Sequence, residues 1–247
     1  MLQKRVIITG ASGGIGKATA SLLKKNGWLV IGIDKNGKNN ECDEFLTVDL
    51  SNSNKINKAC EKIIKKHNSI SGLVNNASIL ITKSIAETKM ADWDLTMDTN
   101  VRSAFLLTKL FAPVLKPDGA IVNISSVHAQ ATSNSISAYA ASKGALVGFT
   151  RAAALELAGD GIRVNAVLPG AVNTNMLKSG LSRGHLESNQ VEQQLEELAQ
   201  KTPLKKIGKP KDIAELIYFL IDNSRSSYIT GQTFTADGGA LARLSTE

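Results

Sequence analysis

The sequence predicts a doubly wound α/β fold: a seven-stranded, mainly parallel sheet covered by helices on both faces. Two observations carry this prediction. Apolar runs of strand length recur along the 247 residues, and helical patterns separate them. Strands of near-continuous apolar sequence that alternate with helices are typical of a parallel sheet buried on both faces. The expected strands lie in residues 5–10, 28–34, 45–50, 72–77, 119–126, 162–170 and 232–239.

The helical patterns follow from apolar periodicity. After the first strand, apolar residues recur at helical spacing from Ile15 to Leu23, and Gly27 supplies a natural stop. The two longest patterns run from about 92 to 112 and from about 139 to 158, without an internal proline. A later helix is expected to open at Pro210, because proline is favoured in the first turn.

Residues 176–202 depart from this alternation. The segment is polar, rich in Gln and Glu, and contains no strand-like run. We expect an insertion that covers the substrate end of the sheet. The chain shows neither an internal repeat nor a linker-like composition, so residues 1–247 are expected to form a single domain.

Composition limits the classes of partner. The balance of 29 Lys and Arg against 22 Asp and Glu gives a net charge of +7, but the lysines are scattered and aromatics make up only 4%. This favours a solvated surface over a nucleic-acid interface. No apolar stretch reaches the roughly 18 residues of a membrane span. Two cysteines fit neither a disulfide framework nor a zinc site, so no bound metal is expected. We expect reduced thiols and a cytoplasmic location. The first strand begins at Arg5, which leaves no room for a secretory leader.

Glycines at positions 10, 13, 14 and 16 lie between the first strand and the first helix. Glycine lets the backbone turn sharply and approach a ligand closely, and the N–H groups at a helix start attract anions. The spacing is not the usual G-x-G-x-x-G dinucleotide fingerprint. A pyrophosphate-binding loop and a purely structural tight turn are both compatible with these glycines.

The pattern T-G-x-x-x-G-x-G, formed by Thr9, Gly10, Gly14 and Gly16, resembles the glycine motif of the classical short-chain dehydrogenase/reductase family. The resemblance implies a Rossmann-type fold and a nicotinamide dinucleotide cofactor. It also implies that the cofactor contacts the loop residues Gly10, Ser12, Gly14, Ile15 and Gly16.

Asp34 ends the second expected strand, eighteen residues after Gly16. A carboxylate there would accept hydrogen bonds from the adenosine ribose hydroxyls and repel a 2′-phosphate. NAD is therefore expected in preference to NADP. Two points stand against this: Asp34 could be an ordinary turn residue, and the neighbouring Lys35 could serve a phosphate.

Ser126, Tyr139 and Lys143 form the expected catalytic set. Ser126 ends a predicted strand at its carboxyl end, where open α/β sheets place their sites. Tyr139 and Lys143 are four residues apart, so a helix presents both on one face. Each residue alone would usually be structural. In the resembled family, an asparagine completes the tetrad, and the matching residue here is Asn100.

The set suits proton transfer to and from an alcohol. Bringing a tyrosine from a pKa near 10 towards 7 costs about 4 kcal/mol. A unit charge about 4 Å away at an effective dielectric near 20 supplies roughly that much, and Lys143 could provide it. Ser126 would hold the substrate oxygen. The resemblance further implies that Lys143 grips the nicotinamide ribose and that Asn100 organises a water-mediated proton path to Lys143.

Further motifs resemble the family over nearly the whole chain, in the segments VDLS, NNAS, LPGAVNT and ITGQTFTADGG. The resemblance implies additional cofactor contacts from Asp49, Leu50, Asn76, Ala77, Pro169, Val172 and Thr174, and from Tyr139 and Lys143. Ser78 departs from the pattern, because the family has glycine there. If that position requires a positive φ, we expect strain or a shift in the turn.

We therefore expect an NAD(H)-dependent oxidoreductase that interconverts a small polar, cyclic or sugar-like secondary alcohol and its ketone. His128 could contact that substrate, although a loop histidine without such a role is equally compatible. The alternatives are an NADP-dependent 3-oxoacyl-carrier-protein reductase and a non-catalytic NAD(H)-binding sensor. The resemblance also implies a homotetramer, with which the apolar stripe FLLTKLFAPVL is compatible.

Overall fold

The computed structural model describes residues 3–37, 39–181 and 190–243, and its sheet contains the seven predicted strands. All neighbouring strands pair in parallel, in the order β3-β2-β1-β4-β5-β6-β7. The predicted fold class is therefore confirmed. The strands are β1 (Arg5–Thr9), β2 (Leu29–Asp34), β3 (Glu44–Thr47), β4 (Ile70–Asn75), β5 (Leu115–Ile124), β6 (Arg163–Pro169) and β7 (Thr233–Ala236).

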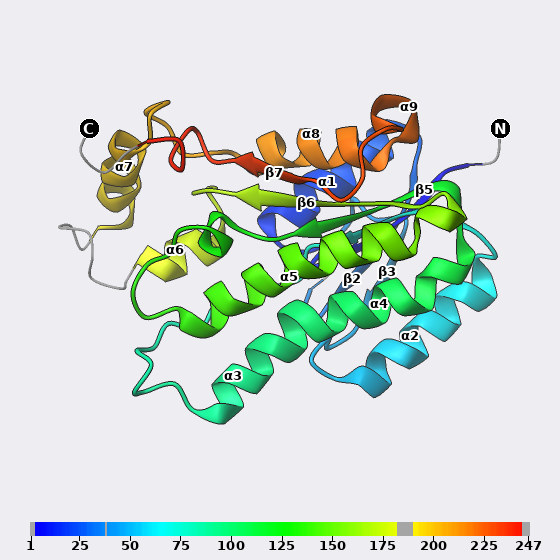
Figure 1. Ribbon diagram of the computed structural model, residues 1–247, viewed down its shortest axis with the longest axis horizontal. Helices are drawn as coiled ribbons and strands as arrows, with labels where there is room; N and C mark the ends of the chain where they lie inside the picture. Colours follow the sequence, from blue (N-terminus) through cyan, green and yellow to red (C-terminus); the bar gives the residue numbers. More distant parts are fainter. Residues whose placement is uncertain (1–2, 38, 182–189, 244–247) are drawn as a thin grey trace.

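Helices cover both faces of the sheet (Figure 1). On one face lie α1 (Gly14–Lys25) and α8 (Pro210–Ile221), and on the other lie α2 (Ser53–Lys66), α4 (Ser103–Phe111) and α5 (Ser137–Glu156). The remaining α-helices of the described residues are α3 (Met90–Met97), α6 (Asn175–Leu181), α7 (Val191–Lys201) and α9 (Asn223–Ser226). None of the helices in the described part of the chain combines the length and apolar character that a membrane crossing requires.

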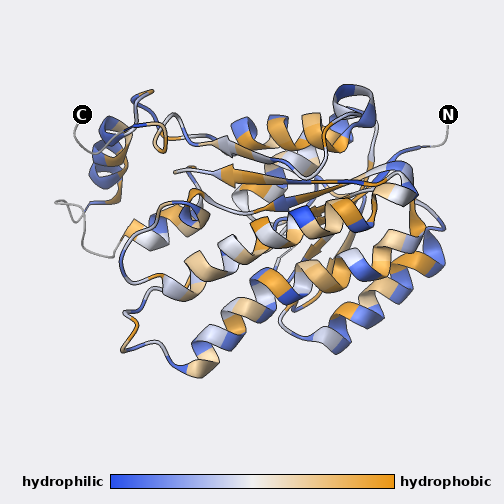
Figure 2. Ribbon diagram, in the orientation of Figure 1, coloured by the Kyte–Doolittle hydropathy of each residue, from blue (hydrophilic) through white to orange (hydrophobic). Residues whose placement is uncertain are grey.

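Alternation along each strand divides the core into two layers. On β1, Val6 and Ile8 pack with the residues of α1 and α8, whereas Ile7 packs with those of α2, α4 and α5. Figure 2 shows apolar residues along the strands, whereas apolar and polar residues alternate along the helices. Each fully buried aliphatic side chain stabilises the fold by about 1.5–3 kcal/mol. The two layers thus hold the strand ends in fixed positions.

The predicted helix over 92–112 is interrupted. It begins earlier, as α3, and then passes through a π-helical turn, η1 (Asp98–Arg102), before continuing as α4. A π turn inserts an extra residue into the helical repeat and is often found at functional sites. Asn100 lies in this turn and is buried.

The segment predicted as an insertion contains helical structure. α6 begins it and α7 closes it, and both lie at the end of the molecule towards which the strand arrows of β6 and β7 point (Figure 1). The middle of the predicted segment, residues 182–189, lies outside the described residues.

Candidate active site

A cavity of about 560 Å³ opens at the carboxyl ends of the strands. There, between β1 and β4, the strand order reverses its direction in the chain, and such a switch point is where open α/β sheets bind ligands. Predicted site residues that line the cavity are Gly10, Ser12, Gly14, Ile15, Asp34, Asp49, Leu50, Asn76, Ala77, Ser126, Tyr139, Lys143, Pro169, Val172 and Thr174. Gly16 and Asn100 do not line it.

The switch point is closed by hydrogen bonds between the ends of β1 and β4. The amide nitrogen of Asn76 donates to the carbonyl oxygens of Thr9 and Gly10, at 3.0 and 3.1 Å. In return, the hydroxyl of Thr9 accepts from the backbone N–H groups of Asn76 and Ala77. The backbone N–H groups after β4 are thus fixed beneath the glycine loop.

The glycines of the loop have separate tasks. Gly10 has φ 62°, a conformation that favours glycine. A Cβ on Gly16 would lie 2.1 Å from the carbonyl oxygen of Gly10, so Gly16 allows α1 to pack against the loop. Gly16 does not line the cavity, and the expected contact between Gly16 and the cofactor stays a prediction. α1 begins at Gly14 without a capping side chain, which leaves N–H groups of its first turn for an anion.

Asp34 lies at the other end of the cavity. Its carboxylate accepts from the backbone N–H of Ser12 at 2.9 Å and from that of Lys35 at 2.7 Å. The amine of Lys35 lies 3.9 Å from the carboxylate of Asp49, another lining residue. A hydrogen bond from Ser51 is the main reason that the pKa of Asp49 is lowered. The carboxylates of Asp34 and Asp49 thus both lie at this end of the cavity, together with Lys35.

These features fit a nicotinamide dinucleotide. The cavity has carboxylates at one end, an uncapped helix start in its wall, and Tyr139 and Lys143 in the same lining. The carboxylates suit ribose hydroxyls, and the helix start suits a pyrophosphate. The chemistry of the lining therefore matches the parts of such a cofactor.

Ser126 lies where β5 leads into a short 3-10 turn, η3 (Val127–Ala129). Its hydroxyl oxygen accepts from the backbone N–H of His128 at 3.2 Å. This contact occupies an acceptor position of the hydroxyl and leaves its proton for a ligand oxygen. The imidazole of His128 makes an edge contact with the ring of Tyr139, with centroids 5.9 Å apart.

Tyr139 and Lys143 lie on the first turns of α5, and both side chains are buried. The amine of Lys143 lies 5.4 Å from the centroid of the Tyr139 ring and donates to the carbonyl oxygen of Ile124 at 2.9 Å. The hydroxyl of Ser125 donates to the carbonyl oxygen of Lys143 at 2.7 Å. α5 and the end of β5 are thus joined at the candidate site.

Burial lowers the pKa of Lys143 to about 7. From the sequence we expected Lys143 to be a full cation, and in the structure that charge is opposed by loss of solvent. A ligand that brings negative charge close to the amine would favour its protonated form. The electrostatic help that Lys143 gives Tyr139 is therefore coupled to occupation of the cavity.

Asn100 holds backbone in place. Its amide oxygen accepts from the backbone N–H of Ile79 at 2.8 Å, and its amide nitrogen donates to the carbonyl oxygen of Ile79 and to the hydroxyl of Ser142, both at 3.0 Å. The hydroxyl of Ser142 in turn donates to the carbonyl oxygen of Tyr139 at 2.7 Å. These contacts connect the chain after β4 to the start of α5. The expected role of Asn100 in a water path to Lys143 stays a prediction.

Several features of the site were not predicted from the sequence. Ser142 and Ser125 were not singled out, although each directly precedes a residue that was. Leu95 and Thr99, from α3 and η1, also line the cavity. The strain considered at Ser78 is absent, because Ser78 has no positive φ. Its hydroxyl is buried and has no hydrogen-bond partner among the described residues.

Comparisons with known proteins cover nearly the whole chain. A family model described as enoyl-(acyl carrier protein) reductase matches residues 10–240. The chain is 34% identical to a 3-oxoacyl-[acyl-carrier-protein] reductase of Thermotoga maritima, over 96% of this chain and 98% of that protein. It is 36% identical to the reductase of the same name from Rickettsia typhi, over 96% of this chain and 97% of that protein.

Among solved structures, the aldohexose dehydrogenase of Thermoplasma acidophilum superposes with a TM-score of 0.92. It is 32% identical, and the match covers 98% of this chain and 96% of that one. The resemblance in sequence and the resemblance in structure therefore both extend over nearly the whole chain.

Proposed function

The chain belongs to the classical short-chain dehydrogenase/reductase family, whose members are oxidoreductases that act on CH–OH groups with NAD or NADP, and we propose that it reduces a 3-oxoacyl thioester with NADH. The single observation that carries the reaction type is the grouping of Ser126, Tyr139 and Lys143 in one cavity at the switch point of the sheet.

In this proposal, a bound nicotinamide supplies the hydride to the carbonyl carbon. The hydroxyl of Ser126 donates a hydrogen bond to the carbonyl oxygen. The phenol of Tyr139 donates the proton that this oxygen needs as it becomes a hydroxyl. Lys143 stabilises the phenolate that remains. In the oxidative direction, Tyr139 takes the proton back, so one residue serves both directions.

The cofactor proposal rests on Asp34. Its carboxylate lines the cavity and accepts from three backbone N–H groups, those of Ser12, Lys35 and Asn36, so it cannot turn away without breaking all three contacts. A 2′-phosphate there would meet a fixed negative charge. Lys35, which could offset that charge, has its amine directed towards Asp49. These contacts support NAD(H) over NADP(H).

The substrate proposal draws on the relatives and on the lining of the cavity. The named relatives are 3-oxoacyl-carrier-protein reductases that align from end to end. Apolar residues from the segment after β4, from α3 and from α6 line the cavity and suit an acyl chain: Ile79, Leu80, Leu95, Met176 and Leu177.

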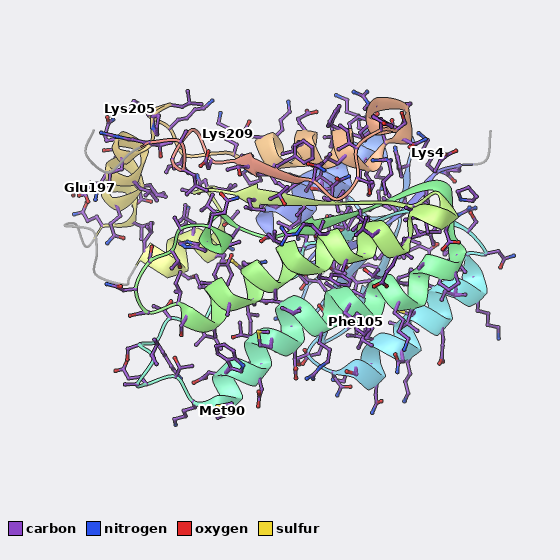
Figure 3. The ribbon with its side chains drawn as sticks, viewed as in Figure 1. Lys4, Met90, Phe105, Glu197, Lys205 and Lys209 are labelled. Carbon is purple, nitrogen blue, oxygen red and sulfur yellow. The ribbon has the colours of Figure 1, made fainter. Side chains whose placement is uncertain are left out.

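The charge near the cavity also suits an acidic carrier protein. Five exposed lysines lie between the end of α7 and the start of α8: Lys201, Lys205, Lys206, Lys209 and Lys211. Pro210 of this segment would be 3.5 Å from a Cβ on Gly14, so its chain neighbours Lys209 and Lys211 lie at the side of the glycine loop. Figure 3 shows Lys205 and Lys209 at the end of the molecule that carries α7.

A second candidate substrate is a small polar, cyclic or sugar-like alcohol. The structural likeness to the aldohexose dehydrogenase supports it, as does His128 in the cavity lining. The non-catalytic sensor is the least supported function, because a sensor needs no proton donor, orienting hydroxyl and amine in one cavity.

A substrate panel tests the proposal. Acetoacetyl thioester, a 2-enoyl thioester, an aldohexose, a polyol and a cyclic ketone or alcohol are each assayed with NAD(H) and NADP(H). We expect the highest kcat/KM with acetoacetyl thioester and NADH. Highest activity with the aldohexose would instead support the second candidate. Failure of every substrate despite NADH binding would support the sensor.

Three further properties belong to the same proposal. A single domain over residues 1–247 is consistent with one sheet formed by strands from both ends of the chain. A homotetramer is supported by Phe105 of α4 (Figure 3) and Leu155 of α5, which are 48% and 81% exposed; a one-chain mass in gel filtration would exclude it. A cytoplasmic location is supported by two cysteines that form no disulfide.

A further inference from the structure

His128 lies beside both groups that the proposed function assigns to the carbonyl oxygen. Its backbone N–H donates to the hydroxyl of Ser126 at 3.2 Å, and its ring meets the ring of Tyr139 edge-on, at 73° and 5.9 Å between centroids. The side chain is half-buried and lines the cavity. A change at His128 therefore alters the surroundings of Ser126 and Tyr139, next to the reacting atoms.

The imidazole is held in its orientation by a second contact. Nδ1 of His128 lies 3.3 Å from the hydroxyl of Thr132, at hydrogen-bond distance. An aromatic neighbour on one side and a hydroxyl on another fix a ring better than either alone, which reduces the entropy lost when a ligand binds. A polar group fixed at a cavity wall is suited to recognition of a specific ligand atom.

The chemistry around the reacting carbonyl leaves a distinct task for this imidazole. Ser126 and Tyr139 both serve the carbonyl oxygen in the proposed reaction. Leu80, Leu95 and Met176 line the cavity and are apolar; they come from the segment after β4, from α3 and from α6. An imidazole can donate or accept a hydrogen bond, so it can serve a second oxygen of the substrate, whether carbonyl or hydroxyl.

We propose that His128 determines substrate specificity by hydrogen-bonding a second oxygen of the substrate, one or two carbons from the carbonyl that Tyr139 protonates. The inference rests on the proposed function. It names the substrate class more closely, because a 3-oxoacyl thioester carries such an oxygen at its thioester carbonyl and a sugar carries one at the next hydroxyl. A simple ketone carries none.

Two variants separate this role from support of the Tyr139 ring. His128→Phe keeps an aromatic neighbour for Tyr139 and removes the hydrogen-bonding group. His128→Gln removes the ring and keeps an amide that can donate and accept. The substrates are methyl acetoacetate, which has the second oxygen, and 2-heptanone, which lacks it and is similar in size. The measured quantity is the ratio of kcat/KM for the first compound to that for the second.

We expect His128→Phe to lower this ratio roughly tenfold, the size of one substrate hydrogen bond, and His128→Gln to stay within about threefold of the unmodified protein. Equal losses with both compounds in both variants would overturn the proposal, and so would an unchanged ratio in His128→Phe. The same ratio is measured as Kd values for the NADH complex of Tyr139→Phe, which requires no turnover.

This second measurement keeps the two claims apart. If the unmodified protein reduces no carbonyl compound with either cofactor, the proposed function fails. The Kd ratio then still decides the role of His128. Preferential binding of methyl acetoacetate that is lost in His128→Phe and kept in His128→Gln supports the inference, and equal binding of both compounds by the unmodified histidine overturns it.

Discussion

The side-chain nitrogen of Lys143 lies 5.4 Å from the centroid of the Tyr139 ring, and both residues are buried on the first turns of α5. Their four-residue separation places them on one face of the helix. The hydrogen bond from Lys143 to the carbonyl oxygen of Ile124 fixes the amine against the end of β5. The pair is thus held by the sheet and by the helix together.

The burial of Lys143 predicts a pH dependence of stability in the cofactor-free protein. Burial lowers its pKa from 10.5 to about 7, so between these pH values the unfolded chain holds a proton that the folded chain lacks. The contribution of Lys143 to stability therefore rises from pH 7 to pH 10, by at most about 1.4 kcal/mol per pH unit, and is constant below pH 7. Denaturant unfolding at pH 7, 8.5 and 10 measures it.

Two substitutions complete this test. Lys143→Met should lose the pH-dependent component. The unfolding free energy of the unmodified protein minus that of Lys143→Met should therefore rise with pH. Lys58→Met, at an exposed lysine of α2, should leave the slope unchanged. Parallel curves for the unmodified protein and Lys143→Met would show that the amine titrates normally.

Ser142→Ala is predicted to loosen the connection between Asn100 and α5. The substitution leaves one N–H of the buried Asn100 amide unpaired and removes a hydrogen bond to the carbonyl oxygen of Tyr139. We expect the unfolding free energy to fall by about 1–3 kcal/mol and kcat to decrease. Thr108→Val is the matched control, because the buried hydroxyl of Thr108 has no partner to lose. A loss of stability in the control as large as in Ser142→Ala would argue against the connection.

Gly16→Ala and Gly148→Ala form a second matched pair of helical glycines. A Cβ on Gly16 would lie 2.1 Å from the carbonyl oxygen of Gly10, whereas a Cβ on the exposed Gly148 of α5 would meet nothing within 4 Å. We expect Gly16→Ala to abolish NADH binding and to lower the midpoint of thermal unfolding. Gly148→Ala should stabilise the protein by up to about 1 kcal/mol. Normal NADH affinity in Gly16→Ala would mean that α1 can shift without disturbing the loop.

Asp34→Asn is predicted to relax the cofactor preference. Asparagine can still accept from the backbone N–H of Ser12, but it lacks the charge that repels a 2′-phosphate. Removing a repulsion of about 1.4 kcal/mol changes a ratio tenfold. We therefore expect the ratio of kcat/KM for NADH to that for NADPH to fall by about tenfold. Asp160→Asn, at an exposed carboxylate that does not line this cavity, should leave the ratio within about twofold, and preference for NADPH in the unmodified protein would refute the assignment.

The strands and helices could be predicted because the apolar pattern of each segment is local in the sequence and indicates which residues are buried. The interruption at η1 could not, because the residues from 92 to 112 carry an unbroken apolar pattern. The π turn coincides with contacts made outside the helix, from Asn100 to Ile79 and to Ser142. Such contacts join segments far apart in the chain, so the local spacing of residues does not predict them.

The candidate site shows the same division. The positions of Ser126, Tyr139 and Lys143 follow from a strand end and a helical repeat, so their grouping could be predicted from the sequence. The lowered pKa of Lys143 depends on the surrounding burial, and the contact between His128 and Tyr139 depends on how η3 packs against α5. Both are properties of the assembled structure.

Tyr139→Phe tests the central claim most directly, because it removes one oxygen atom and keeps the ring. The measurement is turnover of acetoacetyl thioester with NADH, alongside the Kd for NADH from its fluorescence. We predict that kcat falls by roughly 10²- to 10⁴-fold, while the Kd for NADH stays within about threefold of that of the unmodified protein. Turnover retained at a tenth or more of the original rate would contradict Tyr139 as the proton donor.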